Sequence, residues 1–251
     1  MGASFILHLL VVAMVGYLIG SINLSIILCK LMGKGDIRDH GSGNAGTTNT
    51  LRTLGKLPAL LVLTFDILKG FIAIKLGMAL MLFGQGAVDI DKLPLAFEYA
   101  TLVAGFASIL GHNFPIYYGF KGGKGIATSL GVILTIEPLI GWTCALFAII
   151  LMIASRMVSL GSIFGSFLYP VLVLVIGDAF GSSSDLALKI PYFIFACLLA
   201  SLAIYRHRAN IDRLLNGTEN KLWKTKKEKE EAAAKADLEA SEKAAEEKGG
   251  K

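Results

Sequence analysis

The chain has 251 residues, of which 54% are hydrophobic and 17% are charged, and its mean hydropathy is +0.64. This composition excludes an ordinary soluble globular domain and a mostly disordered chain, so we expect a polytopic membrane protein. The formal net charge is +5, and Lys and Arg still exceed Asp and Glu when the charged residues 221–251 are set aside. A basic membrane protein suits an anionic substrate or lipid, although cytoplasmic loops ordinarily carry extra Lys and Arg.

Apolar runs near the length that crosses a bilayer, about 20 residues, make up most of the chain before the tail. The longest run, Ile126–Ser155, contains Glu137 followed by Pro138, and a proline disfavours helix at the residue before it. We therefore divide this run and expect an all-α polytopic membrane protein with about seven transmembrane segments, the fourth short or re-entrant. The expected segments are Phe5–Lys30, Leu57–Phe83, Leu95–Tyr118, Thr128–Ile136, Leu139–Ser155, Val158–Ile176 and Ile190–Tyr205.

The distribution of Lys and Arg among the loops predicts the orientation. A six-segment arrangement would move Arg156 and the cluster at Arg206 outside, against the positive-inside rule. We therefore predict seven segments, with the N-terminus outside and the C-terminus cytoplasmic. The inner loops then hold Lys34, Arg38, Arg52, Lys56, Lys121, Lys124, Arg156, Arg206, Arg208 and Arg213, whereas the outer loops hold Lys92 and Lys189.

The chain is expected to form an integral membrane domain over residues 1–222 and a charged, low-complexity cytoplasmic tail over residues 223–251. The tail is rich in Ala, Glu and Lys and has no apolar face, which is typical of a solvated helix or a disordered extension. No basic residue precedes Lys30, so the first segment is expected to remain as a helix and not to be removed as a signal peptide. Cys29, Cys144 and Cys197 lie inside apolar runs and are interpreted as small buried residues.

The first predicted cytoplasmic loop reads HGSGNAGTTNTLRTLGK, from His40 to Lys56. Its G-x-G-x-x-G string does not predict a dinucleotide site, because a membrane segment and not a β-strand precedes it. Glycines do let backbone N–H groups approach an anion, and a guanidinium fork suits phosphate. The alternative is a polar turn that caps the next helix. The candidate phosphate-binding groups are those of Ser42, Gly43, Asn44, Thr47, Thr48, Asn49 and Arg52.

The second loop reads GHNFPIYYGFKGGKGIATS and places Gly122, Gly123 and Gly125 around Lys124, just before an apolar segment. A glycine-rich turn at a helix N-terminus is an anion site, because backbone donors, the helix dipole and a Lys act together. It is not a Walker A loop, since no Ser or Thr follows the Lys. The alternative is a flexible basic turn.

The third cytoplasmic patch is YRHRANIDRLLNGTEN, in which His207 and Asn210 share one face if the patch is helical. The alternative for His207 is a solvent-facing residue at the membrane interface. Asp66 and Lys69 lie inside the second apolar run, where they are expected to pair or to line a cavity, and His112 is expected to be structural. No nucleophile–base pair, carboxylate pair or Cys/His cluster is evident, which disfavours covalent and metal catalysis.

Together the strings GSINLSIILCKLMGKGDIRDHGSGNAGTTNTLRTLGK, GHNFPIYYGFKGGKGIATSLGV and YRHRANIDRLLNGTENKL closely resemble the bacterial membrane-integral glycerol-3-phosphate acyltransferases that use acyl-phosphate as donor. The resemblance implies acyl transfer to the 1-hydroxyl of glycerol-3-phosphate, giving 1-acyl-glycerol-3-phosphate (lysophosphatidic acid) and phosphate, without cofactor or metal. It implies a bacterial inner-membrane protein whose active site faces the cytoplasm. The implied partners are both substrates, the lipid bilayer and the soluble enzyme that makes acyl-phosphate, with no nucleic acid.

The resemblance also assigns roles by position. Ala209 stands where relatives commonly carry Glu, which puts an essential role of that Glu in doubt, and Glu219 matches a position tied to structure. Either His207 or a phosphate oxygen of the donor would be the general base. The rival function is a transporter or binding protein for an organic phosphate. The implied catalytic residues are His207, Asn210, Lys124 and Ser42, and the implied substrate-binding residues are Arg52, Thr48, Gly43, Asn44, Gly122, Gly123, Gly125, Ser159 and Ser162.

Overall fold

The computed structural model describes residues 3–83, 93–176 and 186–223, which form helices joined by loops. The predicted outer loops at 84–92 and 177–185, and the tail from residue 224 on, lie outside the described residues. The helices are α1 Ala3–Ser21, α2 Leu24–Leu31, α3 Thr47–Thr53, α4 Lys56–Phe83, α5 Leu93–Asn113, α6 Ile126–Ile136, α7 Pro138–Ser155, α8 Val158–Ile176, α9 Leu186–Arg206 and α10 Arg208–Leu215, with 3-10 turns at Ile37–Asp39 and Ile116–Tyr118.

Six helical stretches of the described residues are long and apolar enough to cross a membrane, and α6 is a shorter apolar helix. This confirms the prediction of an all-α polytopic protein with long segments and one short one. Eleven residues rise about 16 Å, roughly half of a bilayer core. The chain turns at Glu137 and Pro138, as expected, and the Tyr169 hydroxyl donates to Glu137 Oε2 at 3.1 Å.

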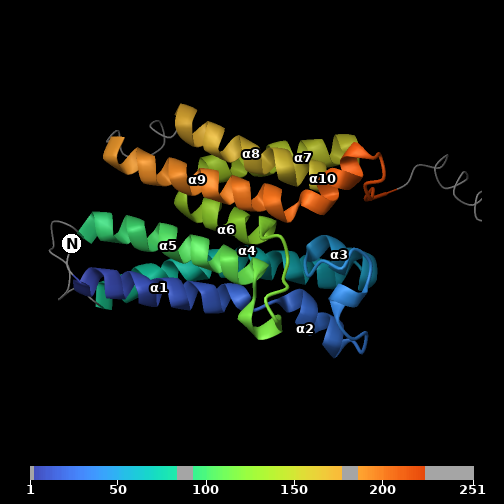
Figure 1. Cartoon of the computed structure of the whole chain (residues 1–251), viewed down its shortest axis with the longest axis horizontal. Coiled ribbons are helices and arrows are strands. Elements are labelled where there is room, and N and C mark those ends of the chain that lie inside the picture. The colour runs from blue at the N-terminus through green and yellow to red at the C-terminus, as the bar shows by residue number, and fades with distance from the viewer. Residues whose placement is uncertain (1–2, 84–92, 177–185, 224–251) are drawn as a thin grey trace, which may run out of the picture.

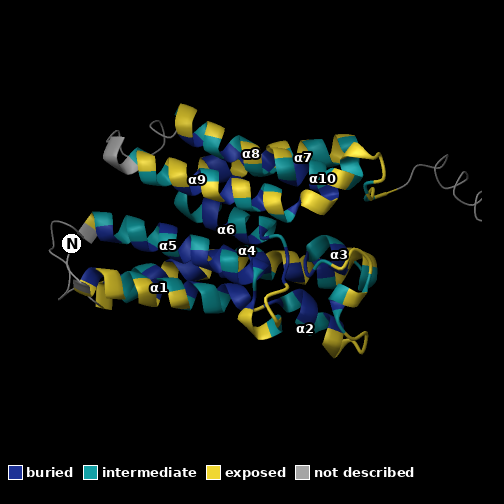
Figure 2. Cartoon of the chain, viewed as in Figure 1, coloured by how far each residue is buried: buried dark blue, intermediate teal, exposed yellow. Residues whose placement is uncertain are grey.

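The short helix α6 lies between two groups of long helices (Figure 1), with α1, α4 and α5 on one side and α7, α8 and α9 on the other. Its residues Val132 and Ile133 join a buried apolar cluster with Ile74, Ile140 and Phe195, from helices of both groups. Figure 2 shows buried residues where the helices face one another and exposed ones on the outside. Because many exposed side chains on the long helices are large and apolar, the outer surface suits lipid.

The helices approach closely where glycines face a neighbouring backbone. A Cβ atom on Gly20 of α1 would collide with the Ser108 carbonyl of α5, and one on Gly131 of α6 would collide with the Ile67 carbonyl of α4. Small residues at such crossings are typical of membrane helix pairs, since van der Waals packing replaces the hydrophobic effect as the driving force. These crossings fix α5 against α1 and α6 against α4, and α4, α5 and α6 all carry residues that line the cavity described below.

The first predicted segment is divided in the structure, which differs from the single helix expected over Phe5–Lys30. Helix α1 ends at Ser21, and Asn23 caps α2 by accepting from Ile26 N at 3.1 Å. The same Asn23 side chain donates to the Ala45 carbonyl at 3.1 Å. The break thus ties the first segment to the loop that follows it.

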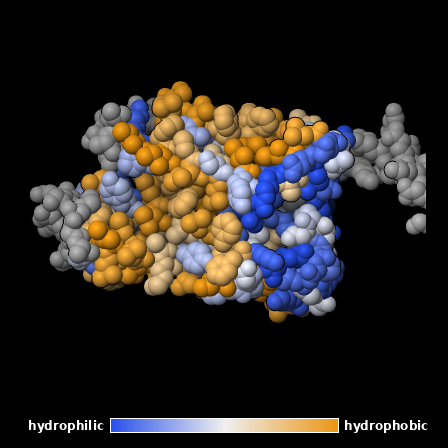
Figure 3. Space-filling model, viewed as in Figure 1, coloured by the Kyte–Doolittle hydropathy of each residue, from blue (hydrophilic) through white to orange (hydrophobic). Residues whose placement is uncertain are grey.

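Polar residues gather at one end of the molecule, over α2, α3 and α10 (Figure 3), whereas the described N-terminal end of α1 lies at the other end. The loops at 32–46 and 119–125 meet at this polar end. The Leu222 amide donates to the Arg156 carbonyl at 2.7 Å, which attaches the end of the described chain there as well.

Candidate active site

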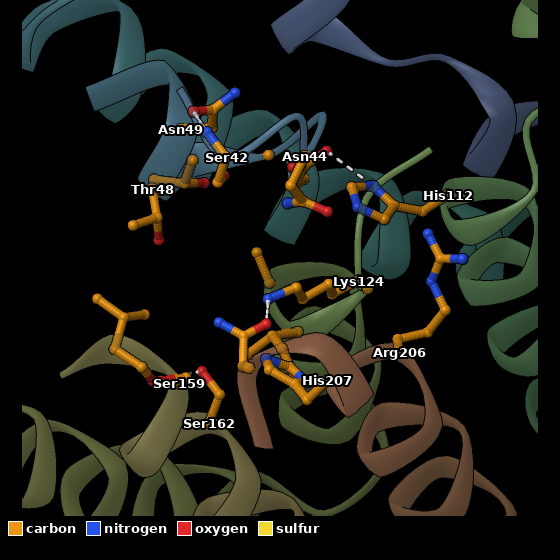
Figure 4. A pocket seen from close by; sticks show the side chains of 18 of the residues that line it. Ser42, Asn44, Thr48, Asn49, His112, Lys124, Ser159, Ser162, Arg206 and His207 are labelled. Atoms are coloured by element: carbon orange, nitrogen blue, oxygen red, sulfur yellow. Dashed lines mark hydrogen bonds and ion pairs between the residues drawn. The ribbon is translucent and has the colours of Figure 1, made fainter. Parts of the chain in front are cut away.

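A cavity of about 1370 Å³ opens at the polar end and is lined by all three motifs of the sequence. Figure 4 shows Lys124 and His207 between Ser42 and Thr48 on one side and Ser159 and Ser162 on the other. One predicted residue, Gly123, does not line the cavity, because it packs against the His112 ring and the Ala45 carbonyl. Thr47 and Asn49 of the first loop also line the cavity. The predicted catalytic and substrate-binding residues that line it are Ser42, Gly43, Asn44, Thr48, Arg52, Gly122, Lys124, Gly125, Ser159, Ser162, His207 and Asn210.

The first loop is held in shape by the buried side chain of Asn49, on α3. Its amide nitrogen donates to the Ile37 carbonyl at 3.0 Å and to the His40 carbonyl at 2.9 Å, and its Oδ1 accepts from Ser42 N at 2.9 Å. Gly41 has φ +57° beside this amide, a conformation that favours glycine. Asn49 was a candidate phosphate ligand in the sequence, but its side chain is instead occupied by the loop, which presents Ser42, Gly43 and Asn44 to the cavity.

The second loop is held by a guanidinium. Arg206, at the end of α9, donates to the Gly123 carbonyl at 2.7 Å and 3.1 Å and to the Gly122 carbonyl at 3.2 Å, and its guanidinium lies over the ring of Phe114. Gly125 then adopts φ +80° and starts α6. The loop carbonyls therefore face Arg206, and Lys124 extends into the cavity.

A chain of polar contacts links Lys124 to the third motif. The Lys124 ammonium donates to Asn210 Oδ1, the Asn210 amide donates to Glu219 Oε1 at 2.8 Å, and Arg213 Nε donates to Glu219 Oε2 at 2.8 Å. The Glu219 carboxylate therefore orients Asn210 so that its oxygen faces Lys124. Glu219, the Glu of NGTE, therefore makes structural contacts, in agreement with the role that the resemblance implies.

His207 caps the start of α10 and is held in one tautomer. Its Nδ1 lies 2.7 Å from the Ala203 carbonyl, which can only accept, so Nδ1 carries the proton. Burial, followed by the charge of Lys124, lowers the pKa of His207 to about 4. The ring is therefore neutral near pH 7, with the lone pair on Nε2.

Lys124 is also perturbed by its surroundings. Burial lowers its pKa to about 8, an effect that Glu219 opposes and that Arg213, Arg206 and Arg52 reinforce. At pH 7 the ammonium remains mostly protonated. An incoming dianion would neutralise this excess of positive charge, so the site favours anionic ligands.

Four helices begin at this cavity: α3 at Thr47, α6 at Ile126, α8 at Val158 and α10 at Arg208. The first N–H groups of a helix have no intrahelical acceptor, and they attract anions. In α8 the buried hydroxyl of Ser159 has no hydrogen-bond partner among the described residues and lines the cavity. It is a donor available to a ligand.

The basic residues at this end divide into two groups. Arg38, Arg206 and Arg213 donate to protein groups: Arg38 to Asp36 and to the Tyr118 carbonyl, at 2.7 Å each. Arg52 lines the cavity and makes no hydrogen bond or ion pair with the described residues. Lys124 donates to Asn210 but keeps two further N–H donors, so Arg52 and Lys124 are the cations that could bind an anionic ligand here.

An apolar arm of the cavity continues between α6, α7 and α8. It is lined by Ile133, Cys144, Ala148, Ile149 and Met152, together with Gly165. Cys29 and Cys144 are buried, as predicted, whereas Cys197 is only partly buried, which corrects the prediction for that residue. Cys144 also faces this arm. The arrangement joins a polar, anion-binding mouth to an apolar channel within the membrane segments, which fits an amphiphile with a phosphate head.

Residues 10–217 match the family described as glycerol-3-phosphate acyltransferase. The chain belongs to this family. It is 44% identical over 210 residues to the glycerol-3-phosphate acyltransferase of Halalkalibacterium halodurans, covering 84% of this chain and 93% of that one. The relative from Thermoanaerobacter pseudethanolicus is 43% identical, with 86% and 96% covered.

Solved structures of the integral membrane glycerol 3-phosphate acyltransferase PlsY (YgiH) are also similar. Its glycerol 3-phosphate form superposes with a TM-score of 0.70 at 37% identity, covering 85% of this chain and 94% of that one. Its lysophosphatidic acid form gives 0.68 at the same identity. The present chain is thus a multi-pass membrane glycerol-3-phosphate acyltransferase, as the motifs predicted, and these matches give no support to the transporter alternative.

Sequence reasoning missed the residues that hold the loops. Arg206 was counted only as a topological charge, and its bonds to Gly122 and Gly123 join segments 83 residues apart. Asn49 was predicted to bind phosphate and instead holds the first loop. A structural role was predicted for His112, but its contact with Lys69 was not. The position of Arg206 at the end of an apolar segment could have indicated a structural role. The sequence alone does not show which carbonyl groups it contacts.

Proposed function

We propose that the protein transfers a fatty acyl group from acyl-phosphate to the 1-hydroxyl of glycerol-3-phosphate at this cavity. The new ester C–O bond forms as the bond from the carbonyl carbon to the phosphate oxygen breaks, and inorganic phosphate leaves. Acyl-phosphate is already activated, so a covalent enzyme intermediate is not needed. The observation that carries the proposal is the union of two available cations, four helix N-termini and an apolar arm in one cavity.

The two phosphates would lie on the two sides of the cavity. Arg52, Ser42 and Thr48 line the side of the first loop and would bind glycerol-3-phosphate, since a guanidinium and hydroxyls suit a phosphate monoester. Lys124 and the α6 N-terminus would hold the donor phosphate and the charge that develops on the carbonyl oxygen. Holding both reactants in place can lower such a barrier by about 7–11 kcal/mol at best.

The lone pair on His207 Nε2 suits it to orient the attacking hydroxyl. A pKa of about 4 makes the imidazolium unfavourable beside Lys124, so His207 is a poor final acceptor for the proton in the free site. A donor phosphate oxygen would take the hydroxyl proton, which then leaves with inorganic phosphate. Asn210, fixed by Glu219, would keep Lys124 directed at that phosphate.

The acyl chain would occupy the apolar arm between α6, α7 and α8, and Ser159 and Ser162 would line its entrance. The Ser159 hydroxyl, which has no partner among the described residues, supports this assignment. The Ser162 hydroxyl donates to the Val158 carbonyl at 2.9 Å, so Ser162 would form part of the wall and not bind the ligand through its hydroxyl. Product and donor would both exchange laterally with the bilayer, which explains a site built on membrane segments.

The cavity would face the cytoplasm of a bacterial inner membrane, with the N-terminus outside. The predicted inner loops gather at the polar, cavity end (Figure 3), and they hold Lys34, Arg38, Arg52, Lys121, Lys124 and Arg156, which supports this orientation through the positive-inside rule. There the site could receive acyl-phosphate from the soluble enzyme that makes it. Thiol labelling in spheroplasts should reach Phe83→Cys from outside and spare Lys121→Cys, and the reverse pattern contradicts this orientation.

Purified full-length protein in detergent tests the reaction. Phosphate release from palmitoyl phosphate should require glycerol-3-phosphate and should match the formation of lysophosphatidic acid mole for mole. Palmitoyl-CoA serves as the control donor and should give no product. Acylation from the CoA ester at a comparable rate, or phosphate release without the acceptor, would contradict the proposed donor and role.

A further inference from the structure

Asp66, Lys69 and His112 form a buried cluster in the membrane body, and Asp66 and His112 belong to the wall of the cavity. Their relative exposures are 2%, 1% and 3%. Lys69 Nζ lies 2.7 Å from Asp66 Oδ1 and 2.7 Å from His112 Nδ1, and it donates to the Ile22 carbonyl at 3.1 Å. The pairing of Asp66 with Lys69 was expected, whereas the third partner was not.

The ammonium of Lys69 selects the tautomer of His112. An ammonium has only donors, so Nδ1 at 2.7 Å must accept, and the ring proton is placed on Nε2. Asp66 Oδ1 lies farther from Nδ1, at 3.4 Å, which agrees with this assignment. The cluster then carries one negative and one positive charge and a neutral ring.

The Nε2 side of that ring packs directly against the second loop. A Cβ atom on Gly123 would collide with His112 Nε2, so no other residue fits there. The His112 carbonyl also accepts from Gly123 N at 3.1 Å. On its carbonyl side the same loop is held by Arg206. The loop that leads to Lys124 is thus fixed from both sides.

We propose that His112, oriented by Lys69 and Asp66, is a positioning residue that holds Gly123 and thereby places Lys124 for acyl transfer. The cluster suits this role because buried ion pairs contribute little net stability compared with apolar packing, so their presence is better explained by the geometry they impose. This inference rests on the proposed role of Lys124. It predicts an effect on the rate of the chemical step more than on the binding of either substrate.

Two amide substitutions separate positioning from simple structural support. His112→Gln extends its amide to about the place of Nε2 and keeps the contact with Gly123, but it loses the acceptor for Lys69. His112→Asn keeps an acceptor near Nδ1 for Lys69 and loses the contact with Gly123. Positioning of the loop predicts that Gln is the more active variant, whereas support of Lys69 alone predicts that Asn is.

The expected result is a fall in kcat of roughly 30- to 100-fold for His112→Asn, the size that a misplacement of about 1 Å causes, with KM for each substrate within about threefold. His112→Gln should lie within about fivefold of the unaltered protein. In a Lys124→Ala background, His112→Asn should cost less than about twofold, because both act on one step. Ser108→Ala is the control for a loss of packing in α5. Ser108 is buried one turn before His112, and its hydroxyl donates to the Gly105 carbonyl at 2.8 Å.

A spin label at Lys121→Cys, in a chain whose three native cysteines are replaced, reports the loop without needing turnover. Its mobility should rise in His112→Asn and remain near that of the parent in His112→Gln. Equal mobility in the two variants, or a kcat of His112→Asn at or above that of His112→Gln, overturns the inference. Failure of palmitoyl phosphate as donor in the parent protein instead overturns the proposed donor, and the mobility comparison still decides the role of His112.

Discussion

The two loops that form the site are built in different ways. The first is ordered by Asn49, whose bonded partners lie no more than twelve residues away in the sequence. The second is ordered by Arg206, 83 residues from Gly123, and by the cluster around His112. The turn around Asn49 can therefore form locally, although Arg38 of the same loop also donates to the carbonyls of Tyr118 and Lys121. The second loop has its shape only when α4, α5 and α9 have packed. Placement of the Lys124 cation is a property of the whole bundle.

Arg206→Met should have the largest effect, because it removes three hydrogen bonds from a charged donor to the carbonyls of Gly122 and Gly123. One such bond is worth about 1.5–3 kcal/mol, and the three bonds of a single guanidinium are not additive. We therefore count a loss of about 3–4 kcal/mol and expect kcat/KM to fall roughly 100- to 1000-fold. Arg206→Lys keeps the charge but not the fork and should lose less. Arg208→Met, an exposed guanidinium two positions later, is the matched control, and an equal loss there would contradict the specific role of Arg206.

Lys124→Ala should come next, with a loss of roughly 10- to 150-fold in kcat/KM and intact folding by size-exclusion chromatography. The estimate is the value of one hydrogen bond to a charged group, about 1.5–3 kcal/mol. Lys121→Ala removes an exposed cation from the same loop and serves as the comparison. Activity of Lys124→Ala within twofold of the parent would exclude Lys124 from the site.

Asn49→Asp tests the local loop by turning the two amide donors into an acceptor that faces the carbonyls of Ile37 and His40. We expect kcat/KM for glycerol-3-phosphate to fall roughly tenfold, the value of about one lost hydrogen bond. Combined with Arg206→Lys, the losses should multiply to within about twofold, because Asn49 and Arg206 share no hydrogen-bond partner. Strong non-additivity would mean that the two loops form one unit, which would contradict the separate ordering of the first loop by Asn49 and of the second by Arg206.

The cavity lining was predictable from sequence where the residue types themselves suit an anionic ligand. Gly122, Gly125, Lys124 and His207 are recognisable because glycine, lysine and histidine carry that chemistry wherever they stand. The supporting groups were not predictable in the same way. Arg206 can pair with any carbonyl, and only the packed bundle selects that of Gly123.

The fold shows the same division. Apolar length alone identified the long segments, and Glu137 with Pro138 identified the break before α7. The break between α1 and α2 was missed because Ser21, Asn23 and Ser25 are small polar residues that an apolar segment can hold without a break. The partner of Asn23, the Ala45 carbonyl, lies 22 residues away in the loop that follows. Asn23 caps α2 locally, but its second hydrogen bond goes to a residue far along the chain, so the sequence around Asn23 does not predict the break.

The pH dependence should report Lys124 of the second loop. Because burial lowers its pKa to about 8 and the protonated ammonium is the active form, kcat/KM should be highest below pH 8 and fall as the pH rises through that value. The loss should reach about tenfold at pH 9, measured by phosphate release. Lys124→Arg stays charged over this range, so its profile should lack the alkaline limb. A limb that persists in that variant must belong to another group.

Truncation after Leu222 should have the smallest effect, because both loops and the α10 network are complete at that residue. The Leu222 amide donates to the Arg156 carbonyl, and Glu219 already holds Asn210. The tail beyond it has almost no apolar surface to bury, and its charges nearly balance, so neither packing nor attraction to the membrane is expected from it. A chain ending at Leu222 should turn over within about twofold of the full-length rate.

A chain ending at Thr218 loses Glu219, and its turnover rate should fall at least tenfold, because Asn210 and with it Lys124 are then no longer held in place. A tenfold loss already at Leu222, in well-folded protein, would show that the tail completes or gates the site.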